Sequence, residues 1–249
     1  MPKPIGIQLY TVRDALSQDY EGTVRRIAEF GYAGVEPAGN FGRGVEWSRD
    51  LFRSLGLQTP SAHVGIPDGD PGATFEILHT LGCTYYVVPW LPPEQFRDRD
   101  SILRVCDRIN AFNTQARAEG FTLAYHNHWF EYEPVGDTFG YRIMLENLDP
   151  TVMFEIDTYW VQTAGCDPVA VIEELGARVP LLHIKDGPCV QDKAMVAVGE
   201  GKMNFAPIIE AAVHAEWLFV ELDRCDTDVM EAVARSIRYL TDEGLGHGN

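Results

Sequence analysis

Short apolar runs alternate with longer amphipathic segments from one end of the chain to the other. The apolar runs span three to seven residues and are rich in Val, Ile, Leu and Tyr. That composition is typical of parallel strands that are buried on both faces. The pattern predicts strands at residues 5–10, 34–36, 59–64, 85–90, 122–128, 152–157, 181–185 and 218–222.

The segments between these runs carry apolar residues three or four positions apart, the spacing of a helix with one buried face. The clearest case is residues 102–119, where one stripe holds Leu103, Cys106, Ile109, Phe112 and Ala116 before Gly120 ends the pattern. Glycine after the last periodic residue is a common helix stop. We predict helices at residues 20–30, 47–55, 74–81, 102–119, 141–148, 169–175, 205–214 and 229–240.

Eight strand–helix units in 249 residues give about 31 residues per unit, which is the usual size of a βα repeat. This arithmetic predicts an α/β protein with a (β/α)8 TIM barrel fold. We expect a single domain over residues 1–249, with a short flexible tail near 244–249. A doubly wound sheet is the structural alternative. It would place a glycine-rich phosphate turn after the first strand, where this chain has Gln8-Leu9-Tyr10-Thr11.

Charge and composition narrow the function classes. The chain has 37 Asp and Glu against 20 Lys and Arg, a net charge of −17, which disfavours binding to nucleic-acid phosphates. No apolar run approaches the roughly 20 residues of a membrane span, and the first residues do not form a secretory signal. The five cysteines are widely spaced, so we expect free thiols. These features predict a cytoplasmic protein that binds neither nucleic acid nor membranes.

Polar residues gather where the predicted strands end. In a (β/α)8 barrel, the active site forms at the carboxyl ends of the strands. The polar or aromatic residues at these ends are Gln8, Tyr10, Glu36, His63, Trp90, His126, Asn127, His128, Glu131, Glu155, Asp157, His183, Lys185, Asp186, Glu221 and Asp223.

Residues two apart on a strand share a face, so several of these groups point the same way. The pairs are His126 with His128, His183 with Lys185, and Glu221 with Asp223. Ionisable groups that converge on one buried mouth are costly unless they are paired or bind a metal. A divalent ion bound by His, Asp, His and Glu would relieve this cost, and mixed N/O ligation suits Mn, Co, Zn, Fe or Mg.

Each residue alone has an ordinary alternative. Asp157 before Thr158 could cap a turn, and Glu221 could be a surface carboxylate. The coincidence of such residues at four successive strand ends favours a metal site.

At these positions the sequence resembles the sugar phosphate isomerase/epimerase family of the xylose-isomerase-like TIM barrel superfamily. The resemblance spans nearly the whole chain, and its motifs occur in the expected order. They read IGIQLYTVRD, YHNHWFEYE, FEIDTYWVQTAGCDP, LLHIKD, VGEGKMNF and FVELD.

The resemblance implies one divalent metal ion held by residues from strands five to eight. Asp157, His183 and Glu221 match the last three ligand positions. Strand five departs from the pattern, because many members carry Glu where this chain has His126. His128 and Glu131 are alternative fourth ligands, and a metal-free site with the two histidines as acid and base stays open.

The resemblance also implies an isomerase or epimerase that abstracts a proton next to a carbonyl and passes through an enediolate. Glu221 would be the base and would also touch the metal, with His128 or Glu131 as the opposite acid or base. Lys185 would hydrogen-bond a substrate hydroxyl or hold the enediolate. Alternatively, it forms a salt bridge to Glu155 or Asp157. The residues that we expect to bind substrate are Gln8, Glu36, His63 and Trp90, and the aromatic candidates for the pocket wall are Trp90, Trp129, Phe130 and Trp160.

We expect a small sugar or cyclitol as the substrate. The net charge and the carboxylate in Gly199-Glu200-Gly201 favour an uncharged sugar over a sugar phosphate. The loop at residues 187–203 is a candidate lid, and the family suggests a possible homo-oligomer. The alternatives are a keto-sugar or inosose dehydratase, a 3-keto-glycoside-cleaving lyase, and a sugar-binding barrel that has lost catalysis. An abasic-site endonuclease would need a basic face that this composition does not offer.

Overall fold

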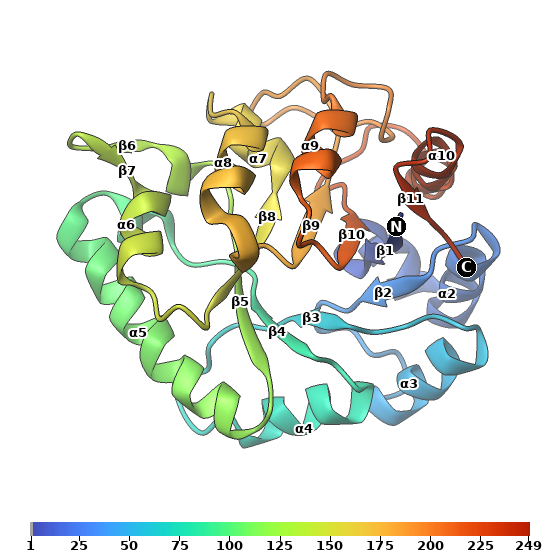
Figure 1. The fold of residues 1–249 in the computed structure, drawn as a ribbon. Coiled ribbons are helices and arrows are strands. Elements are labelled where there is room, and N and C mark those ends of the chain that lie inside the picture. Colours follow the sequence, from blue (N-terminus) through green and yellow to red (C-terminus); the bar gives the residue numbers. More distant parts are fainter. Residues whose placement is uncertain (1) are drawn as a thin grey trace.

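The computed structural model describes residues 2–249 and confirms the predicted fold. Eight parallel strands form a nearly closed barrel inside a ring of helices (Figure 1). The barrel strands are β1 (Lys3–Gln8), β2 (Gly34–Glu36), β3 (Ser61–His63), β4 (Tyr85–Val88), β5 (Thr122–His126), β8 (Met153–Asp157), β9 (Leu181–Ile184) and β10 (Trp217–Val220).

Strand pairing follows the order of a TIM barrel. β1 pairs with both β2 and β10, and the sheet continues through β9, β8, β5, β4 and β3. A single bridge, Gly34 with Gln58, and the hydrogen bond from His63 N to Pro37 O (2.9 Å) join β2 to β3. The ladder is therefore thinnest at this seam, and the barrel is nearly rather than fully closed.

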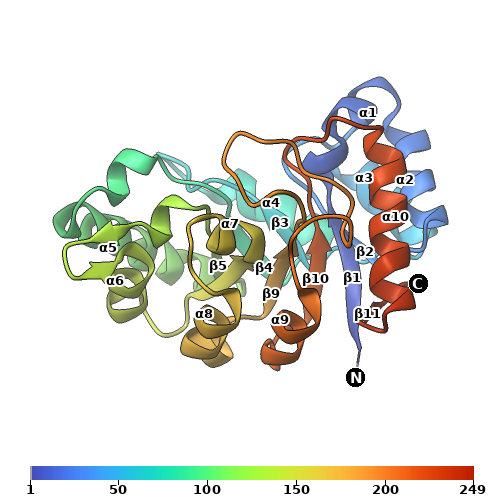
Figure 2. The same cartoon turned by 90° about the horizontal axis from the view of Figure 1, so that it is seen from above.

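Within residues 2–249, ten α-helices cover the strands (Figure 2). They are α1 (Arg13–Gln18), α2 (Tyr20–Glu29), α3 (Val45–Ser54), α4 (Gly72–Leu81), α5 (Arg99–Ala118), α6 (Gly140–Asn147), α7 (Thr158–Thr163), α8 (Pro168–Leu175), α9 (Phe205–Ala211) and α10 (Val229–Asp242). The eight predicted helices are present, although α9 ends at Ala211. The sequence pattern missed α1, α7 and the hairpin of β6 (Pro134–Val135) and β7 (Thr138–Phe139).

The carboxyl terminus departs from the prediction of a flexible tail at 244–249. Residues Gly246–His247 form β11, which pairs with Lys3 and Pro4 of β1. The backbone N–H of Asn249 donates to Gly31 O at 2.9 Å. The two ends of the chain therefore lie side by side on one edge of the barrel (Figure 1).

The barrel interior has an apolar half and a charged half. Toward the amino ends of the strands, buried apolar side chains fill the space: Ala33, Tyr85, Val87, Ala124, Leu181, Trp217 and Phe219. Toward the carboxyl ends, the buried side chains are mostly histidines and carboxylates. Across residues 2–249, no helix combines the length and apolar character that crossing a bilayer requires.

Candidate active site

The period of two along each strand builds the charged half. On β5, β8, β9 and β10, an apolar interior residue is followed two positions later by an ionisable one: Ala124 by His126, Met153 by Glu155, Leu181 by His183, and Phe219 by Glu221. The next alternate positions hold further polar groups, which are His128, Asp157, Lys185 and Asp223. Side chains from four neighbouring strands thus converge at one level of the barrel.

Four of the predicted ligands converge in the structure. Each of His126, Asp157, His183 and Glu221 offers a nitrogen or oxygen atom, and these atoms all lie within 4.8 Å of one another. All four side chains are buried. Two imidazoles and two carboxylates form a mixed N/O set that suits Zn, Mn, Co or Fe. The residues present therefore fit the divalent ion that the sequence predicts.

Lys185 supplies a cation beside the two carboxylates of this set. Its Nζ lies 2.8 Å from Asp157 Oδ2, 2.7 Å from Glu221 Oε2 and 2.8 Å from Asp223 Oδ2. The side chain is fully buried, and its ammonium lies 5.6 Å from the centre of the Trp160 ring. Burial opposes the charged form, but the three carboxylates raise the pKa of Lys185 well above its ordinary value. Of the two predicted salt-bridge partners, the lysine contacts Asp157.

The surroundings of Glu221 and Asp157 shift the pKa values of the two carboxylates in opposite directions. Burial favours neutral Glu221, but Lys185 and His183 hold its pKa well below the ordinary value. Burial outweighs the same lysine at Asp157 and raises its pKa to about 6. Glu221 is therefore the better ionised base at neutral pH, and Asp157 titrates close to neutrality.

The histidines also differ from one another. Burial opposes a charge on His183, but Glu155 and Glu221 raise its pKa well above the ordinary value. Burial and the neighbouring His183 push the pKa of His126 well below the ordinary value. Burial and Lys185 lower the pKa of His128 to about 3. His126 and His128 are thus neutral imidazoles at pH 7, the form that binds metals or accepts a proton.

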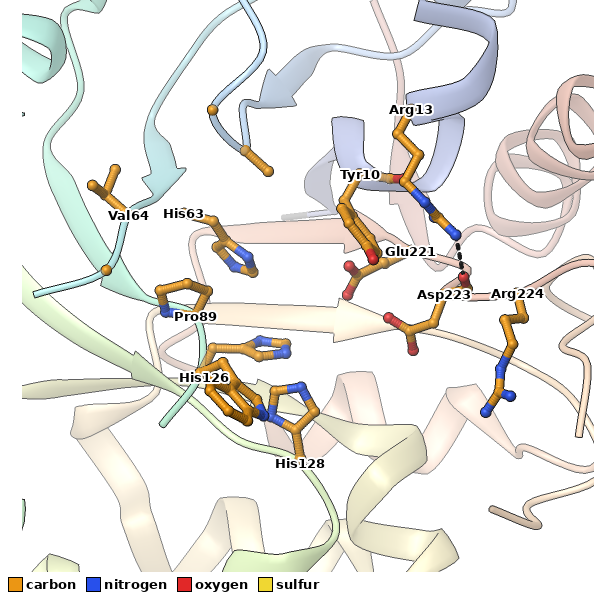
Figure 3. Close-up of a pocket in the computed structure, with 14 residues that line it drawn as sticks. Tyr10, Arg13, His63, Val64, Pro89, His126, His128, Glu221, Asp223 and Arg224 are labelled. Atoms are coloured by element: carbon orange, nitrogen blue, oxygen red, sulfur yellow. Dashed lines mark hydrogen bonds between the residues drawn. The ribbon is translucent and has the colours of Figure 1, made fainter. Parts of the chain in front are cut away.

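A cavity of about 760 Å³ opens above the cluster. Figure 3 shows His63, His126 and His128 on one side and Glu221 and Asp223 across from them. Asp157, His183 and Lys185 lie below this surface, with no exposed area. The cavity therefore gives a ligand direct access to Glu221 and to three histidines.

The aromatic candidates divide between wall and core. Trp90 is 49% exposed and lines the cavity. Phe130 and Trp160 are buried in the core, and Trp129 is partly buried against it. Tyr10 also lines the cavity and is 45% exposed, although the sequence did not single out its ring.

Two of the predicted substrate-binding residues lie beneath the cavity. Gln8 and Glu36 have no exposed area, and Gln8 Nε2 donates to Glu36 Oε1 at 2.7 Å. The hydroxyl of Ser61 donates to the other oxygen of Glu36. This arrangement makes the pair a buried support for the histidines, whereas His63 reaches the cavity.

Glu131 also lies away from the cavity. Its Oε1 accepts from the Tyr125 hydroxyl at 2.6 Å, and its Oε2 accepts from the backbone N–H of His128 at 2.9 Å. Burial raises the pKa of Glu131 to about 7. The carboxylate fixes the turn that carries His128, and neither oxygen belongs to the ligand set.

Glu155 is the site residue whose part the sequence analysis missed. It precedes Asp157 by two positions, so it shares the interior face of β8. Its Oε2 lies 2.6 Å from His63 Nε2, 3.1 Å from His126 Nδ1 and 3.1 Å from His183 Nε2. With these three histidines it forms a second possible ligand set, in which Glu155 lies two residues before Asp157 on β8 and thus deeper in the barrel, while His63 reaches the cavity. The alternation of side chains along β8 is the one sequence signal that points the Glu155 side chain into the barrel.

The loop at residues 187–203, a candidate lid in the sequence, packs onto the barrel. The Asp186 carboxylate accepts from the backbone N–H groups of Gly187, Gly199, Gly201 and Met203 at 2.8–3.1 Å. Met195 in the middle of the loop is buried, and its N–H donates to Arg224 O at 2.8 Å. The loop thereby braces the segment that carries Asp223 and Arg224 at the cavity wall.

Comparison with known proteins agrees with this geometry. The model of the family described as xylose isomerase-like TIM barrel matches residues 72–243. A sugar phosphate isomerase/epimerase structure from Parabacteroides distasonis superposes with a TM-score of 0.82 at 27% identity, and the match covers 96% of this chain and 94% of that one. No curated protein matches the sequence.

More distant structures share the fold. The IOLI protein, solved with a bound zinc atom, superposes with a TM-score of 0.71 at 14% identity, over 98% of both chains. The probable 3-DHS dehydratase AsbF from Bacillus anthracis also gives a TM-score of 0.71, at 12% identity, over 96% of this chain and 98% of that one. The family model covers well over half of the sequence. The matched region contains all four residues of the ligand set, His126, Asp157, His183 and Glu221. The chain therefore belongs to the xylose isomerase-like TIM barrel family.

Proposed function

We propose that the protein is a divalent-metal-dependent isomerase or epimerase of a small, uncharged sugar or cyclitol, and that it removes a proton from the carbon next to a carbonyl. One observation carries the proposal. An ionised carboxylate, Glu221, and a neutral imidazole, His128, line the same cavity beside a four-residue ligand set.

The residues that would hold the ion are His126, Asp157, His183 and Glu221. A divalent ion held there would supply Lewis-acid chemistry, which would polarise a substrate carbonyl. Lys185 already balances the two carboxylates of the set, so the site combines a fixed cation with ligands for a second one.

Glu221 is the proposed base. Its Oε2 contacts Lys185 Nζ and His183 Nδ1, both at 2.7 Å. The contacts that the described residues make with the Glu221 carboxylate use Oε2, which leaves Oε1 to accept a proton from a substrate carbon. Because the pKa of Glu221 is held low, the carboxylate is ionised throughout the neutral range.

His128 is the proposed opposite acid or base. Its side chain lines the cavity, and its buried Nδ1 has no hydrogen-bond partner in the described part of the chain, so no protein group fixes the ring tautomer. The imidazole lies across the cavity from Glu221 in Figure 3. Epimerisation needs proton transfer on two faces of a carbon, and two such groups supply it.

The same pair also supports elimination. His128 is not paired with a carboxylate side chain, and as a neutral imidazole it can offer its ring N–H as a hydrogen bond to a departing hydroxyl or glycosidic oxygen. The candidate reactions are dehydration of a keto-sugar or inosose and cleavage of a 3-keto-glycoside. Both begin with the proton abstraction assigned to Glu221, so product analysis separates them from isomerisation.

An uncharged substrate suits the cavity wall. The Arg13 guanidinium donates to Tyr10 O at 2.8 Å and to Asp223 O at 3.0 Å, and Arg224 pairs with Asp192. These cations are therefore already committed to protein groups. Trp90 presents an exposed ring, which suits the apolar face of a sugar.

Solvent exchange tests the proposal. The protein, purified and supplied with Mn²⁺, Co²⁺ or Zn²⁺, is incubated with keto-sugars and inososes in deuterium oxide, and deuterium at the carbon next to the carbonyl is measured. We expect exchange with at least one substrate and its loss in Glu221→Gln. The surface variant Glu21→Gln removes the same charge far from the site and should exchange as the wild type does.

Two outcomes contradict the proposal. If Glu221→Gln or Asp157→Ala leaves exchange unchanged for an accepted substrate, the assigned site is wrong. If the protein binds sugars without any exchange, it is a sugar-binding barrel that has lost catalysis.

A further inference from the structure

A single carboxylate oxygen joins three histidines from three strands. Glu155 Oε2 lies within 3.1 Å of nitrogens of His63 on β3, His126 on β5 and His183 on β9. Glu155 and His183 have no exposed area, and His126 is 2% exposed. Hydrogen bonds at such depth are strong, because water does not compete for them.

His126 and His183 each lie between two layers of carboxylates, a layer nearer the cavity with Asp157 and Glu221 and a deeper layer with Glu155. Each ring turns one nitrogen to each layer. His126 turns Nδ1 to Glu155 at 3.1 Å and Nε2 toward Asp157 Oδ2 at 3.9 Å. His183 turns Nε2 to Glu155 at 3.1 Å and Nδ1 toward Glu221 Oε2 at 2.7 Å. The layer nearer the cavity thus meets one nitrogen of each ring, and the deeper layer meets the other.

A histidine that binds a metal usually donates its second ring N–H to a carboxylate, and this bond fixes which nitrogen faces the ion. With an ion bound at the other nitrogen, the nitrogen that faces Glu155 would therefore carry the single ring proton. Glu36 reinforces this at His183, where Glu36 Oε1 lies 2.9 Å from Nε2. His126 Nε2 and His183 Nδ1 are left for the layer that contains Asp157 and Glu221.

The deeper group of His63, His126, Glu155 and His183 competes as a ligand set. It would need the two ring nitrogens that face Glu155. At His183 Nε2 a metal would have to displace Glu36, which belongs to neither ligand set, whereas the carboxylate that faces Nδ1 is Glu221, itself a member of the set nearer the cavity. The deeper layer is also the one in which Glu36, Gln8 and Ser61 form a connected hydrogen-bond network, which is typical of a support for ligands.

We propose that Glu155 is a positioning residue. Its carboxylate accepts N–H hydrogen bonds from His126 Nδ1 and His183 Nε2, and thereby directs His126 Nε2 and His183 Nδ1 to the ion. This inference rests on the proposed metal dependence. It goes further, because it selects one of two overlapping ligand sets and assigns the ring nitrogens.

The direct test is the nitrogen connectivity of His126 and His183 in the zinc-loaded protein. Long-range proton–nitrogen NMR correlations on ¹⁵N-histidine-labelled protein report which ring nitrogen carries the proton and which binds zinc. We expect His126 to carry its proton on Nδ1 and His183 on Nε2. Zinc bound through His126 Nδ1 or His183 Nε2 would overturn the inference. A role of Glu155 in stability alone would not determine which nitrogen of each ring carries the proton.

Zinc affinity supplies a second test. Loss of such a partner typically costs 10–100-fold in metal affinity. By calorimetry we expect about a tenfold loss in Glu155→Gln, which keeps an acceptor oxygen, and about a hundredfold loss in Glu155→Leu. The control Glu174→Gln removes a carboxylate that pairs with Arg142 at the surface, and it should bind zinc as the wild type does.

The outcomes separate the two proposals. If the wild type binds no zinc, manganese or cobalt, both the metal-dependent function and this inference fail. If the wild type binds zinc and a folded Glu155→Leu binds it equally well, the inference fails and the proposed function stands. The NMR measurement needs only wild-type protein, so it decides the question even where the variants do not fold.

Discussion

The two halves of the barrel interior are built from the same strands by the same alternation, yet their chemistry is opposite. On β9, Leu181 belongs to the apolar half, and two residues later His183 begins the charged half. On β10, Phe219 and Glu221 divide in the same way, and the ring centres of Phe219 and His183 are 6.0 Å apart. Two residues along a strand therefore separate the apolar core from the ionisable cluster of the candidate active site.

The comparison shows what each half does for the other. The apolar half keeps water from beneath the cluster, so the ion pairs of Lys185 act in a medium of low polarity. The charged half contributes little hydrophobic burial and holds ionisable groups that are costly to bury. We therefore expect variants in the apolar half to act on stability, and variants in the charged half to act on stability and metal binding together.

The largest effect is expected in the apolar half. Phe219→Ala removes a fully buried ring that stacks on Trp217, with ring centres 5.7 Å apart. It should lower the free energy of unfolding by about 3–5 kcal/mol, measured by chemical denaturation. Val213→Ala, at a position that is 71% exposed, is the control and should stay within about 0.5 kcal/mol of the wild type. A loss below about 1 kcal/mol in Phe219→Ala would show that this half is not a tightly packed core.

Lys185→Met should sharpen the contrast between the halves. Without its ammonium, the carboxylates of Asp157, Glu221 and Asp223 face one another in a buried site. Removing one partner of a buried ion pair costs about 3–5 kcal/mol, and we expect the lower end, because protonation of Asp157 and Asp223 relieves part of the repulsion. Added divalent metal should raise the thermal midpoint of the variant more than that of the wild type. Equal shifts would mean that the lysine and the metal do not share these carboxylates.

Asp186→Asn tests the brace beside the charged half. An amide cannot accept hydrogen bonds at both of its ends, so two of the four backbone N–H groups lose their partner. The expected loss of unfolding free energy is about 2 kcal/mol. Hydrogen exchange should accelerate across the loop at 187–203 and at Arg224, and not across the apolar half. Unchanged exchange in this loop would contradict the bracing role.

The smallest effect is expected at the cavity rim. Trp90 is half exposed and contributes little to the core, so Trp90→Ala should leave the thermal midpoint nearly unchanged. Loss of an aromatic contact worth about 0.5–1.5 kcal/mol would weaken binding of an accepted sugar roughly two- to thirteenfold. A change in kcat with KM unaffected would place Trp90 in the chemical step instead.

The fold was predictable because it depends on patterns that repeat. Eight apolar runs and the helices between them are visible in the sequence, and their boundaries fall within a few residues of the structure. The helix α7 was missed because Asp157 ends a strand and caps a helix at once, through its Oδ1 and the N–H of Trp160 at 3.0 Å. The tail pairs with β1 through backbone groups, which leave no signal in side-chain periodicity.

The sequence predicts only those features of the site that follow from the alternation of side chains along each strand. Strand ends and the period of two bring His126, Asp157, His183 and Glu221 together, as the structure has them. The same rule points Glu155 inward, but its three histidine partners come from β3, β5 and β9 and depend on how the barrel closes. Glu131 turns away because a short turn after β5 brings it to the Tyr125 hydroxyl, a contact that residue spacing does not determine.

The central claim is that the charged half holds one divalent ion against the cavity. Anomalous diffraction from crystals loaded with Mn²⁺ or Zn²⁺ tests it most directly. The account predicts one strong anomalous peak within bonding distance of His126, Asp157, His183 and Glu221. A barrel without a peak, or a peak among His63, Glu155 and the deeper nitrogens of His126 and His183, would contradict it.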